Sequence, residues 1–118
     1  MALSLQNVTS ITPDQSYGSM STGTSTLISN TSSSQFYKIN SIIVSNVDGT
    51  NDVDINVWVL ENGSTSYYIA KTVTVPADST LIVLTKDTPL YLQDTSSLQC
   101  SASSTGDAQI IVQYDFCI

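Results

Sequence analysis

The chain has 118 residues, and its three lysines, with no arginine or histidine, stand against ten acidic residues for a net charge of −7. This length supports one domain and excludes a multidomain enzyme. With so few cations the chain cannot build the positive field that phosphate backbones or anionic bilayers attract, so we expect neither nucleic acid nor a membrane as a partner.

Hydrophobic residues make up 41% of the chain, which is enough for a core and argues against overall disorder. No apolar run approaches the ~18 residues of a membrane span. The first ten residues lack both the basic charge and the apolar stretch of a secretion signal, so we expect a chain made and kept in a cytosol-like compartment.

The first 22 residues hold one short apolar alternation, at Leu3, Leu5 and Val8, before a Ser-rich, Gly-containing stretch over residues 16–25. Such a segment is typical of an extended arm or an edge strand. We therefore divide the chain into an N-terminal arm or edge strand, residues 1–22, and a β-sandwich domain, residues 23–118. The first strand of that domain is predicted within residues 24–30.

The strand signal is strongest from Phe36 to Val47, which is rich in β-branched and aromatic residues and is followed by a turn cluster over residues 48–52. This pattern predicts a hairpin with the next strand. That strand alternates, with one set of residues facing the core and the other facing away. The core set is Val53, Ile55, Val57 and Val59, and the opposite set is Asp54, Asn56, Trp58 and Leu60.

A second hairpin is predicted at Asn62-Gly63, before a strand that ends at Pro76. A longer loop with Gly63 in the left-handed region keeps apolar residues opposite one another, and we favour it. It pairs Val53 with Val73, Val57 with Ile69 and Val59 with Tyr67. The alternative two-residue turn pairs Val57 with Tyr68 and Asn56 with Ile69, and it matches Asp54 to Lys71.

The remaining strands are predicted at residues 80–85, 90–93, 98–103 and 110–116, with a hairpin turn at residues 104–107. That hairpin places Cys100 near Ile111 and Cys117 near Asp94, so the two sulfurs lie roughly 20 Å apart and stay reduced. Eight or nine short strands without a helical period predict an all-β fold, a single antiparallel two-sheet β-sandwich that is jelly-roll-like or immunoglobulin-like.

No catalytic or metal site is predicted. Without histidine the chain lacks the usual base of serine and cysteine nucleophiles, so we expect no enzyme. Asp52 and Asp54 share a strand face, which we interpret as a solvated face beside a turn. The run from Asp48 to Asp54 offers oxygen ligands for calcium but lacks the flanks and terminal Glu of an EF-hand, so a plain hairpin loop is expected, with no cofactor.

Aromatic residues on an outward strand face are the most informative feature. Trp58 lies on a polar face with Tyr68 beside it, and Tyr91 stands between Pro89 and Gln93. They could be covered by the arm or the other sheet, contact another protein, or form a sugar-stacking platform. The candidate interface residues are Leu3, Leu5, Trp58, Tyr68 and Tyr91.

Several segments resemble small β-sandwich virion structural proteins of tailed bacteriophages, including marine cyanophage-like phages. They are residues 37–46 (YKINSIIVSN), 75–81 (VPADSTL), 86–92 (KDTPLYL), Ser97-Leu98 and Ala102-Ser103. The resemblance covers about residues 36–115.

What the resemblance implies is a virion structural protein, assembled in the host cytoplasm. The expected role is a capsid decoration or cement protein on the outer head surface, with phage capsid or other virion proteins as partners and a homo-oligomeric state. In this reading the N-terminal arm, residues 1–23, reaches a neighbour. A neck, tail or fibre component is the first alternative, and a carbohydrate-binding module for host attachment is the second.

Overall fold

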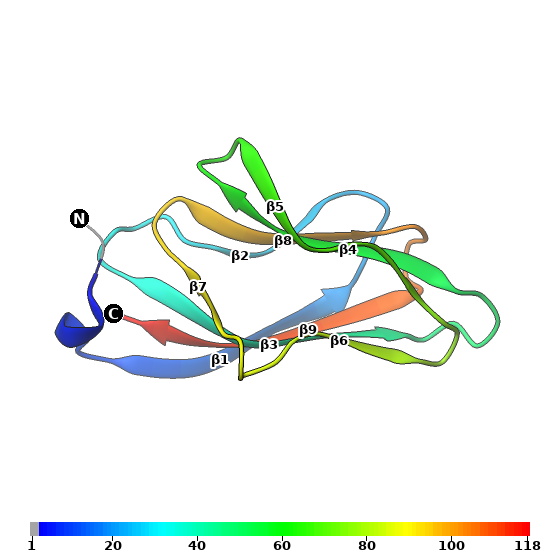
Figure 1. Ribbon diagram of the computed structural model, residues 1–118, viewed down its shortest axis with the longest axis horizontal. Helices are drawn as coiled ribbons and strands as arrows, with labels where there is room; N and C mark the ends of the chain where they lie inside the picture. Colours follow the sequence, from blue (N-terminus) through cyan, green and yellow to red (C-terminus); the bar gives the residue numbers. More distant parts are fainter. Residues whose placement is uncertain (1–2) are drawn as a thin grey trace.

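A computed structural model describes residues 3–118 and contains nine strands and one turn of 3-10 helix, Leu5–Asn7 (Figure 1). Sheet A contains β1 (Ile11–Ser19), β9 (Ala108–Cys117), β3 (Phe36–Asn46) and β6 (Thr80–Leu84) in that order, and β7 (Leu90–Leu92) also pairs with β3. Sheet B contains β2 (Ser25–Ser29), β8 (Ser96–Ala102), β4 (Val53–Glu61) and β5 (Thr65–Val75). The predicted two-sheet antiparallel sandwich is confirmed.

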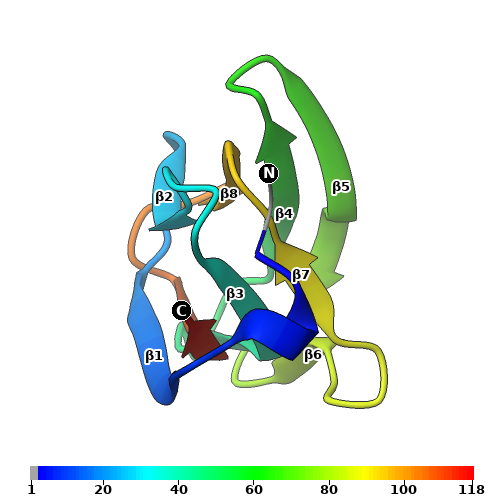
Figure 2. The same cartoon turned by 90° about the vertical axis from the view of Figure 1, so that its left-hand side faces the viewer.

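The strand pairing is that of a jelly roll. The antiparallel pairs are nested around the β4–β5 hairpin: β4 pairs with β5, β3 with β6 and β7, β2 with β8, and β1 with β9. Such nesting arises when one long antiparallel ribbon folds over into two layers, which are seen facing one another in Figure 2. Of the two predicted sandwich types, the topology is the jelly roll and not the immunoglobulin fold.

Two of the predicted hairpins are wrong. β3 and β4 lie in different sheets, and so do β8 and β9, so each connection crosses between the layers. A turn cluster signals that the chain reverses but does not say whether the next strand pairs with the previous one. Cys100 is therefore opposite Val57 and Ser25 in sheet B, not near Ile111.

Cys117 lies in sheet A opposite Phe36 and Ile11. Both cysteines are buried free thiols, although the hairpin used to estimate their separation does not form.

The β4–β5 hairpin confirms the longer loop. Gly63 has a φ of +68° within the connection Asn62–Ser64, and Val59 is opposite Tyr67 as predicted. Further along, Val57 lies opposite Ala70 and Val53 opposite Val75, so those two predicted pairs are wrong. The register shifts between Ile55 and Trp58 cause the difference, and the Glu61–Thr65 pair beside the loop excludes the two-residue register.

Two bulges on β5 produce these shifts: one leaves Ile69 without a ladder partner, and the other includes Thr72. Its φ of +51° is in the left-handed region, and its N–H leaves the ladder to donate to Asn56 Oδ1 at 2.9 Å. Asp54 is consequently opposite Thr74 and not Lys71.

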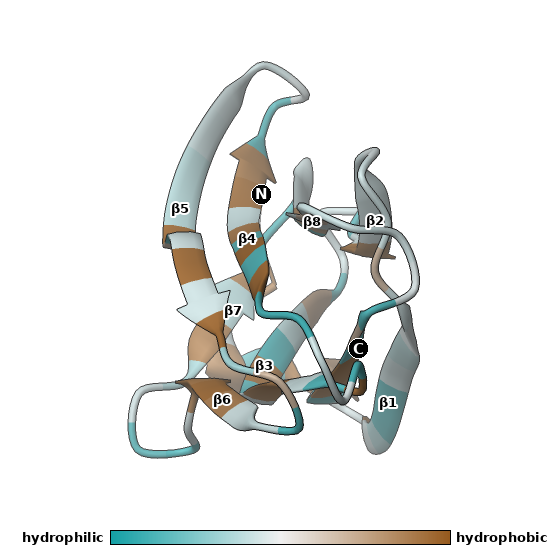
Figure 3. Cartoon of the chain, turned by 90° about the vertical axis from the view of Figure 1, so that its right-hand side faces the viewer, coloured by the Kyte–Doolittle hydropathy of each residue, from teal (hydrophilic) through white to brown (hydrophobic). Residues whose placement is uncertain are grey.

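The core fills the space between the two sheets. Val53, Ile55 and Val57 are fully buried as predicted, while Val59 is only half-buried near the protruding hairpin tip. In Figure 3 much of β4 and β6 is hydrophobic, whereas β1 and the tip half of β5 are pale or hydrophilic. The other large core residues come from both sheets and from the β1–β2 connection, and they include Met20, Ile39, Ile42, Val44, Val75, Leu92, Leu98, Ile110 and Val112.

The N-terminal segment joins the sandwich at its edge. β1 pairs with β9 along its whole length, from Ile11 opposite Cys117 to Ser19 opposite Gln109. Just before it, the N–H groups of Thr9 and Ser10 donate to the Ile118 carbonyl at 2.8 and 2.9 Å. Residues 11–19 are thus the edge strand of sheet A, and residues 3–8 lie beyond that strand.

Candidate functional site

The five predicted interface residues fall into two groups on different sheets. Leu3, Leu5 and Tyr91 gather at one end of sheet A, whereas Trp58 and Tyr68 are cross-strand neighbours in sheet B. The structure therefore brings three of them together in one place and two in another. These two surfaces differ in how much of their apolar area is covered.

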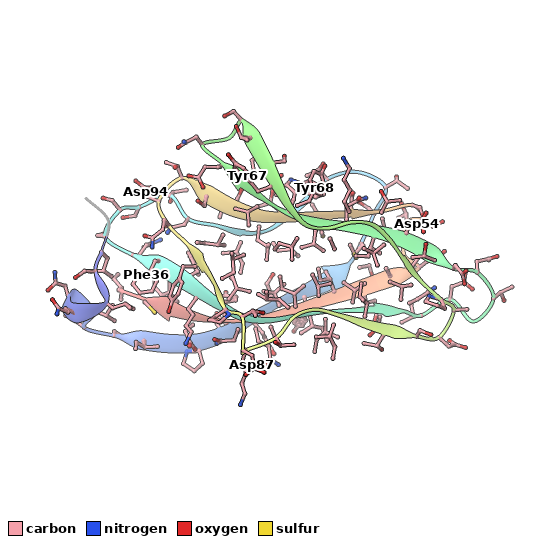
Figure 4. The ribbon with its side chains drawn as sticks, in the orientation of Figure 1. Phe36, Asp54, Tyr67, Tyr68, Asp87 and Asp94 are labelled. Carbon is pink, nitrogen blue, oxygen red and sulfur yellow. The ribbon has the colours of Figure 1, made fainter. Side chains whose placement is uncertain are left out.

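The first surface is a hollow of about 240 Å³, here called the N-terminal hollow, and its lining residues are Leu3, Ser4, Leu5, Phe36, Tyr91 and Gln93. Phe36 forms its floor: it is 2% exposed, lies outside the main core cluster, and its ring centre is 5.7 Å from that of Tyr91. Figure 2 shows the N-terminal helical turn in front of β3 near β7, and Figure 4 labels Phe36 in this region.

Cover over this hollow is incomplete. Leu3 is half-buried, but Leu5 is 70% and Tyr91 41% exposed. Because apolar surface left in water is unfavourable, this end of sheet A can gain stability from a further contact.

Sequence reasoning missed Phe36 and Gln93 as part of this surface. The available signal was strand alternation: Phe36 shares a face with Lys38, opposite the face of core residue Ile39. An aromatic residue on the outward face at the start of a strand needs cover from outside the sandwich. The N-terminal residues supply part of it.

Trp58 is not the exposed aromatic that its polar strand face predicts. Its side chain is 7% exposed, because Tyr68 packs against it from β5 with ring centres 5.5 Å apart. On the other side, the indole N–H donates to Gln99 Oε1 on β8 at 3.0 Å. The cover comes from neighbours in the same sheet and not from the N-terminal segment or sheet A.

Tyr68 is 46% exposed and makes a cation–π interaction with Lys71, whose Nζ lies 4.8 Å from the ring centre. Gln99 Nε2 in turn donates to Thr26 Oγ1 at 3.0 Å, so one row of contacts crosses all four strands of sheet B. Figure 4 shows Tyr67 and Tyr68 on β5, while Tyr91 belongs to sheet A. The three predicted aromatic residues therefore do not form a single platform.

The acidic residues near the β3–β4 loop hydrogen-bond to their surroundings separately. Asp54 Oδ1 accepts from Thr74 Oγ1 at 2.6 Å, and Asp52 Oδ1 accepts from the Ala77 N–H at 3.3 Å. Hydrogen bonds from the Thr50 N–H and then the Asn51 amide lower the pKa of Asp48. Within residues 3–118 no group of three or more His, Cys, Asp or Glu side chains converges on a point.

Neither thiol is activated. Burial raises the pKa of Cys100 to about 11 and also raises the pKa of Cys117. The thiolate is the reactive form, so both cysteines are weak nucleophiles at neutral pH. In the described part of the chain, no helix has the length and apolar character needed to cross a membrane.

Comparison with known proteins leaves the family open. No protein-family model matches the chain, and no curated protein is significantly similar to it. A solved structure of a Bacillus endospore appendage protein, from a family of disulfide-linked pili, is similar with a TM-score of 0.53 and 12% identity. The match covers 92% of this chain and 88% of that one, and it shows a shared fold.

Two pentameric capsid proteins from metagenomic phage sequences are more distantly similar, with TM-scores of 0.44 and 0.43 and identities of 17% and 13%. These matches cover 87% of this chain and 61% and 59% of the capsid chains. Similarities of this size do not bear on the role of this chain.

Proposed function

We propose that this chain is a virion structural protein, a decoration or cement protein that binds the outer surface of a phage head and stabilises it. The sequence resemblance described above supports this role, and a jelly roll is a fold that viral capsid domains use, although fold alone does not fix function. Such a protein acts by burying surface between neighbours, so it needs no catalytic group.

The observation that carries the proposal is the partly filled N-terminal hollow. It joins Leu3, Leu5 and Tyr91 around the ring of Phe36, and its apolar rim remains exposed. A capsid subunit that inserts an apolar side chain here would cover the exposed parts of Leu5 and Tyr91. Residues 3–8 precede the edge strand, so they can shift toward a neighbour without breaking the β1–β9 pairing.

A binding experiment tests this role through Leu5. Particles of the phage that encodes the chain, stripped of it, are incubated with full-length protein, and bound copies are measured after sedimentation. Burying one leucine contributes about 1.5–3 kcal/mol, so Leu5→Ser should weaken binding at least tenfold. The matched control is Tyr67→Ser, which alters a side chain of similar exposure (63% against 70%) on sheet B and should bind normally. Equal binding by both variants and the unaltered chain would contradict the proposal.

Within the virion class, a neck, tail or fibre component uses the same kind of surface. Copy number distinguishes these positions from a decoration protein, because a decorated shell carries copies in proportion to its capsomers. A carbohydrate-binding module has less support, since Trp58 is buried and Tyr91 lies on the other sheet.

A second candidate is a subunit of a surface appendage, favoured by the fold shared with the Bacillus appendage protein. Electron microscopy of the purified chain distinguishes the two, because an appendage subunit forms filaments by itself and a decoration protein binds a preformed shell. Disulfide linkage between subunits would require Cys100 or Cys117 to leave a buried position.

A further inference from the structure

A row of apolar side chains crosses the outer face of sheet A from edge to edge. Tyr17 on β1 is opposite Ile111 on β9, Ile111 is opposite Ile43 on β3, and Ile43 is opposite Ile82 on β6. Each of these residues lies between inward-facing neighbours along its strand, so all four point away from the core. We call this set the outer row.

The outer row is largely uncovered. Tyr17 is 66%, Ile82 61% and Ile111 41% exposed, and Ile43 is half-buried between its neighbours. A hollow of about 460 Å³ includes Ile43 and Ile82 in its lining, and a second of about 250 Å³ includes Tyr17 and Ile111. Isolated exposed apolar residues are common on proteins, but a continuous row over four strands marks a contact surface.

Charge is absent from this row and from both rows beside it. The flanking rows consist of Ser19, Gln109, Ser45 and Thr80 on one side and Gln15, Gln113 and Ser41 on the other, where Leu84 lines the same hollow as Ser41. None of the ten acidic residues occupies these twelve positions, although the chain carries a net charge of −7. The nearest charged side chains border these rows: Lys86 lines the larger hollow, and Asp115, opposite Lys38, lies two residues beyond Gln113.

This charge distribution indicates what covers the row. Two molecules that each carry −7 repel one another, and this is a face on which they can meet without placing carboxylates together. The flanking hydroxyl and amide groups both donate and accept hydrogen bonds, so the surface is complementary to itself. A foreign partner selected by charge would find nothing within these three rows to recognise.

The outer face of sheet B differs in both respects. The polar groups of its central row already hydrogen-bond to one another, from Trp58 to Gln99 and from Gln99 to Thr26. Charged groups also lie nearby, at Asp54 and Lys71. Sheet A is therefore the face that gains more from a partner.

We propose that a second copy of this chain covers the outer row, sheet A against sheet A, in a two-fold symmetric dimer. A two-fold axis along the strands between β9 and β3 sets Ile111 against Ile43 and Tyr17 against Ile82 of the second copy. Sheets pack face to face in this way within β-sandwiches. The inference goes beyond the proposed role on a virion and does not depend on it.

The size of the surface predicts a weak dimer. Four strands about 4.8 Å apart and three rows about 6.8 Å apart span roughly 400 Å² in projection. Counted over both copies this is about 800 Å², which is the size of a weak, transient interface, so we expect a Kd on the order of tens of micromolar or weaker.

Sedimentation velocity of the full chain from about 1 to about 500 µM tests the proposal. The weight-average mass should rise from the monomer value of 12.6 kDa toward twice that value. Ile82→Asp places a carboxylate in the row and should weaken the dimer at least ~100-fold. Tyr67→Asp is the matched control, since Tyr67 is equally exposed (63%) on sheet B, and should associate normally.

Salt provides a second readout that does not depend on a variant. Because the contact is uncharged and the molecules repel, raising the salt concentration should keep or strengthen the dimer. A chain that stays monomeric at every concentration would overturn the proposal. So would normal association by Ile82→Asp, or loss of the dimer in Tyr67→Asp with unfolding excluded by circular dichroism.

Discussion

Asn46 ends β3 with a buried amide that ties the β3–β4 loop to sheet B, and its replacement by alanine is the most informative test of the fold. The residue is 2% exposed. Its Nδ2 donates to the carbonyls of Asn51 and Val75, both at 2.9 Å, and its Oδ1 accepts from the Asp48 N–H at 2.9 Å.

The magnitude follows from where the three partners lie. Val75 is 1% exposed, so its carbonyl loses a partner that water cannot readily replace, at a cost of about 1–3 kcal/mol. Asn51 and Asp48 lie in an accessible loop, where each lost bond costs about 0.5 kcal/mol. Asn46→Ala should therefore lower the free energy of unfolding by about 2–4 kcal/mol, or the Tm by about 8–16 °C.

Urea unfolding followed by the fluorescence of Trp58, the single tryptophan of the chain and a buried residue, measures this change. Asn46→Asp tests the direction of these hydrogen bonds, because it replaces the donating Nδ2 with an oxygen that faces the carbonyls of Asn51 and Val75. This variant should lower the free energy of unfolding at least as much as Asn46→Ala. Asn7→Ala, at an exposed position, should change stability by under about 0.5 kcal/mol. An Asn46→Ala protein as stable as the Asn7→Ala protein would refute the reasoning.

Three further predictions concern the backbone and the buried thiol. Thr72 is a β-branched residue at a φ of +51°, so Thr72→Asn should raise the free energy of unfolding by about 0.5–1 kcal/mol; a decrease measured by urea titration would contradict the assigned strain. Gly63 has a φ of +68° and open space around it, so Gly63→Ala should destabilise by about 1 kcal/mol through its backbone alone, whereas Gly18→Ala, with equal space and no positive φ, should change little. Burial raises the pKa of Cys100 from its ordinary value of 9.0 to about 11, so above pH 9 the unfolded chain releases a proton that the folded chain keeps. Stability should therefore fall between pH 9 and pH 11 by up to roughly 2–3 kcal/mol, and Cys100→Ala should show a shallower decline; an unchanged slope in that variant would assign the effect to other groups.

The positions of the strands could be predicted from the sequence because alternation and turn residues are local signals. The core set Val53, Ile55 and Val57 follows from their spacing alone, and Gly63 takes the left-handed conformation that the hairpin loop requires. Every strand predicted from residue 36 onward has a counterpart in the structure.

The choice between a hairpin and a crossing connection could not be predicted, because it depends on partners distant in sequence. Asn46 reaches the Val75 carbonyl, 29 residues away, and Asn30 Nδ2 reaches the Leu92 carbonyl, 62 residues away. Both asparagines are buried immediately before a loop that crosses between the sheets. A polar residue at a core position before a turn is a local sign of such a crossing, but it does not identify the distant partner strand.

The burial of outward-facing side chains by neighbouring strands was equally hard to predict from the pattern of a single strand. The burial of Trp58 depends on Tyr68, which faces it in the register set by the hairpin loop, and on Gln99, which faces it only because β8 pairs with β4. The outer row of sheet A has the same origin, since Tyr17, Ile43 and Ile82 align only after the strands pair in the order β1, β9, β3, β6. Predicting a surface requires the sheet order as well as the strand pattern.

The measurement that tests the proposed role most directly is quantitative mass spectrometry of purified particles, with copies of this chain expressed relative to the major capsid protein. A decoration or cement protein predicts a ratio that scales with the whole shell. A handful of copies per particle would place the chain in the neck, tail or fibres, and its absence from particles would contradict the virion role.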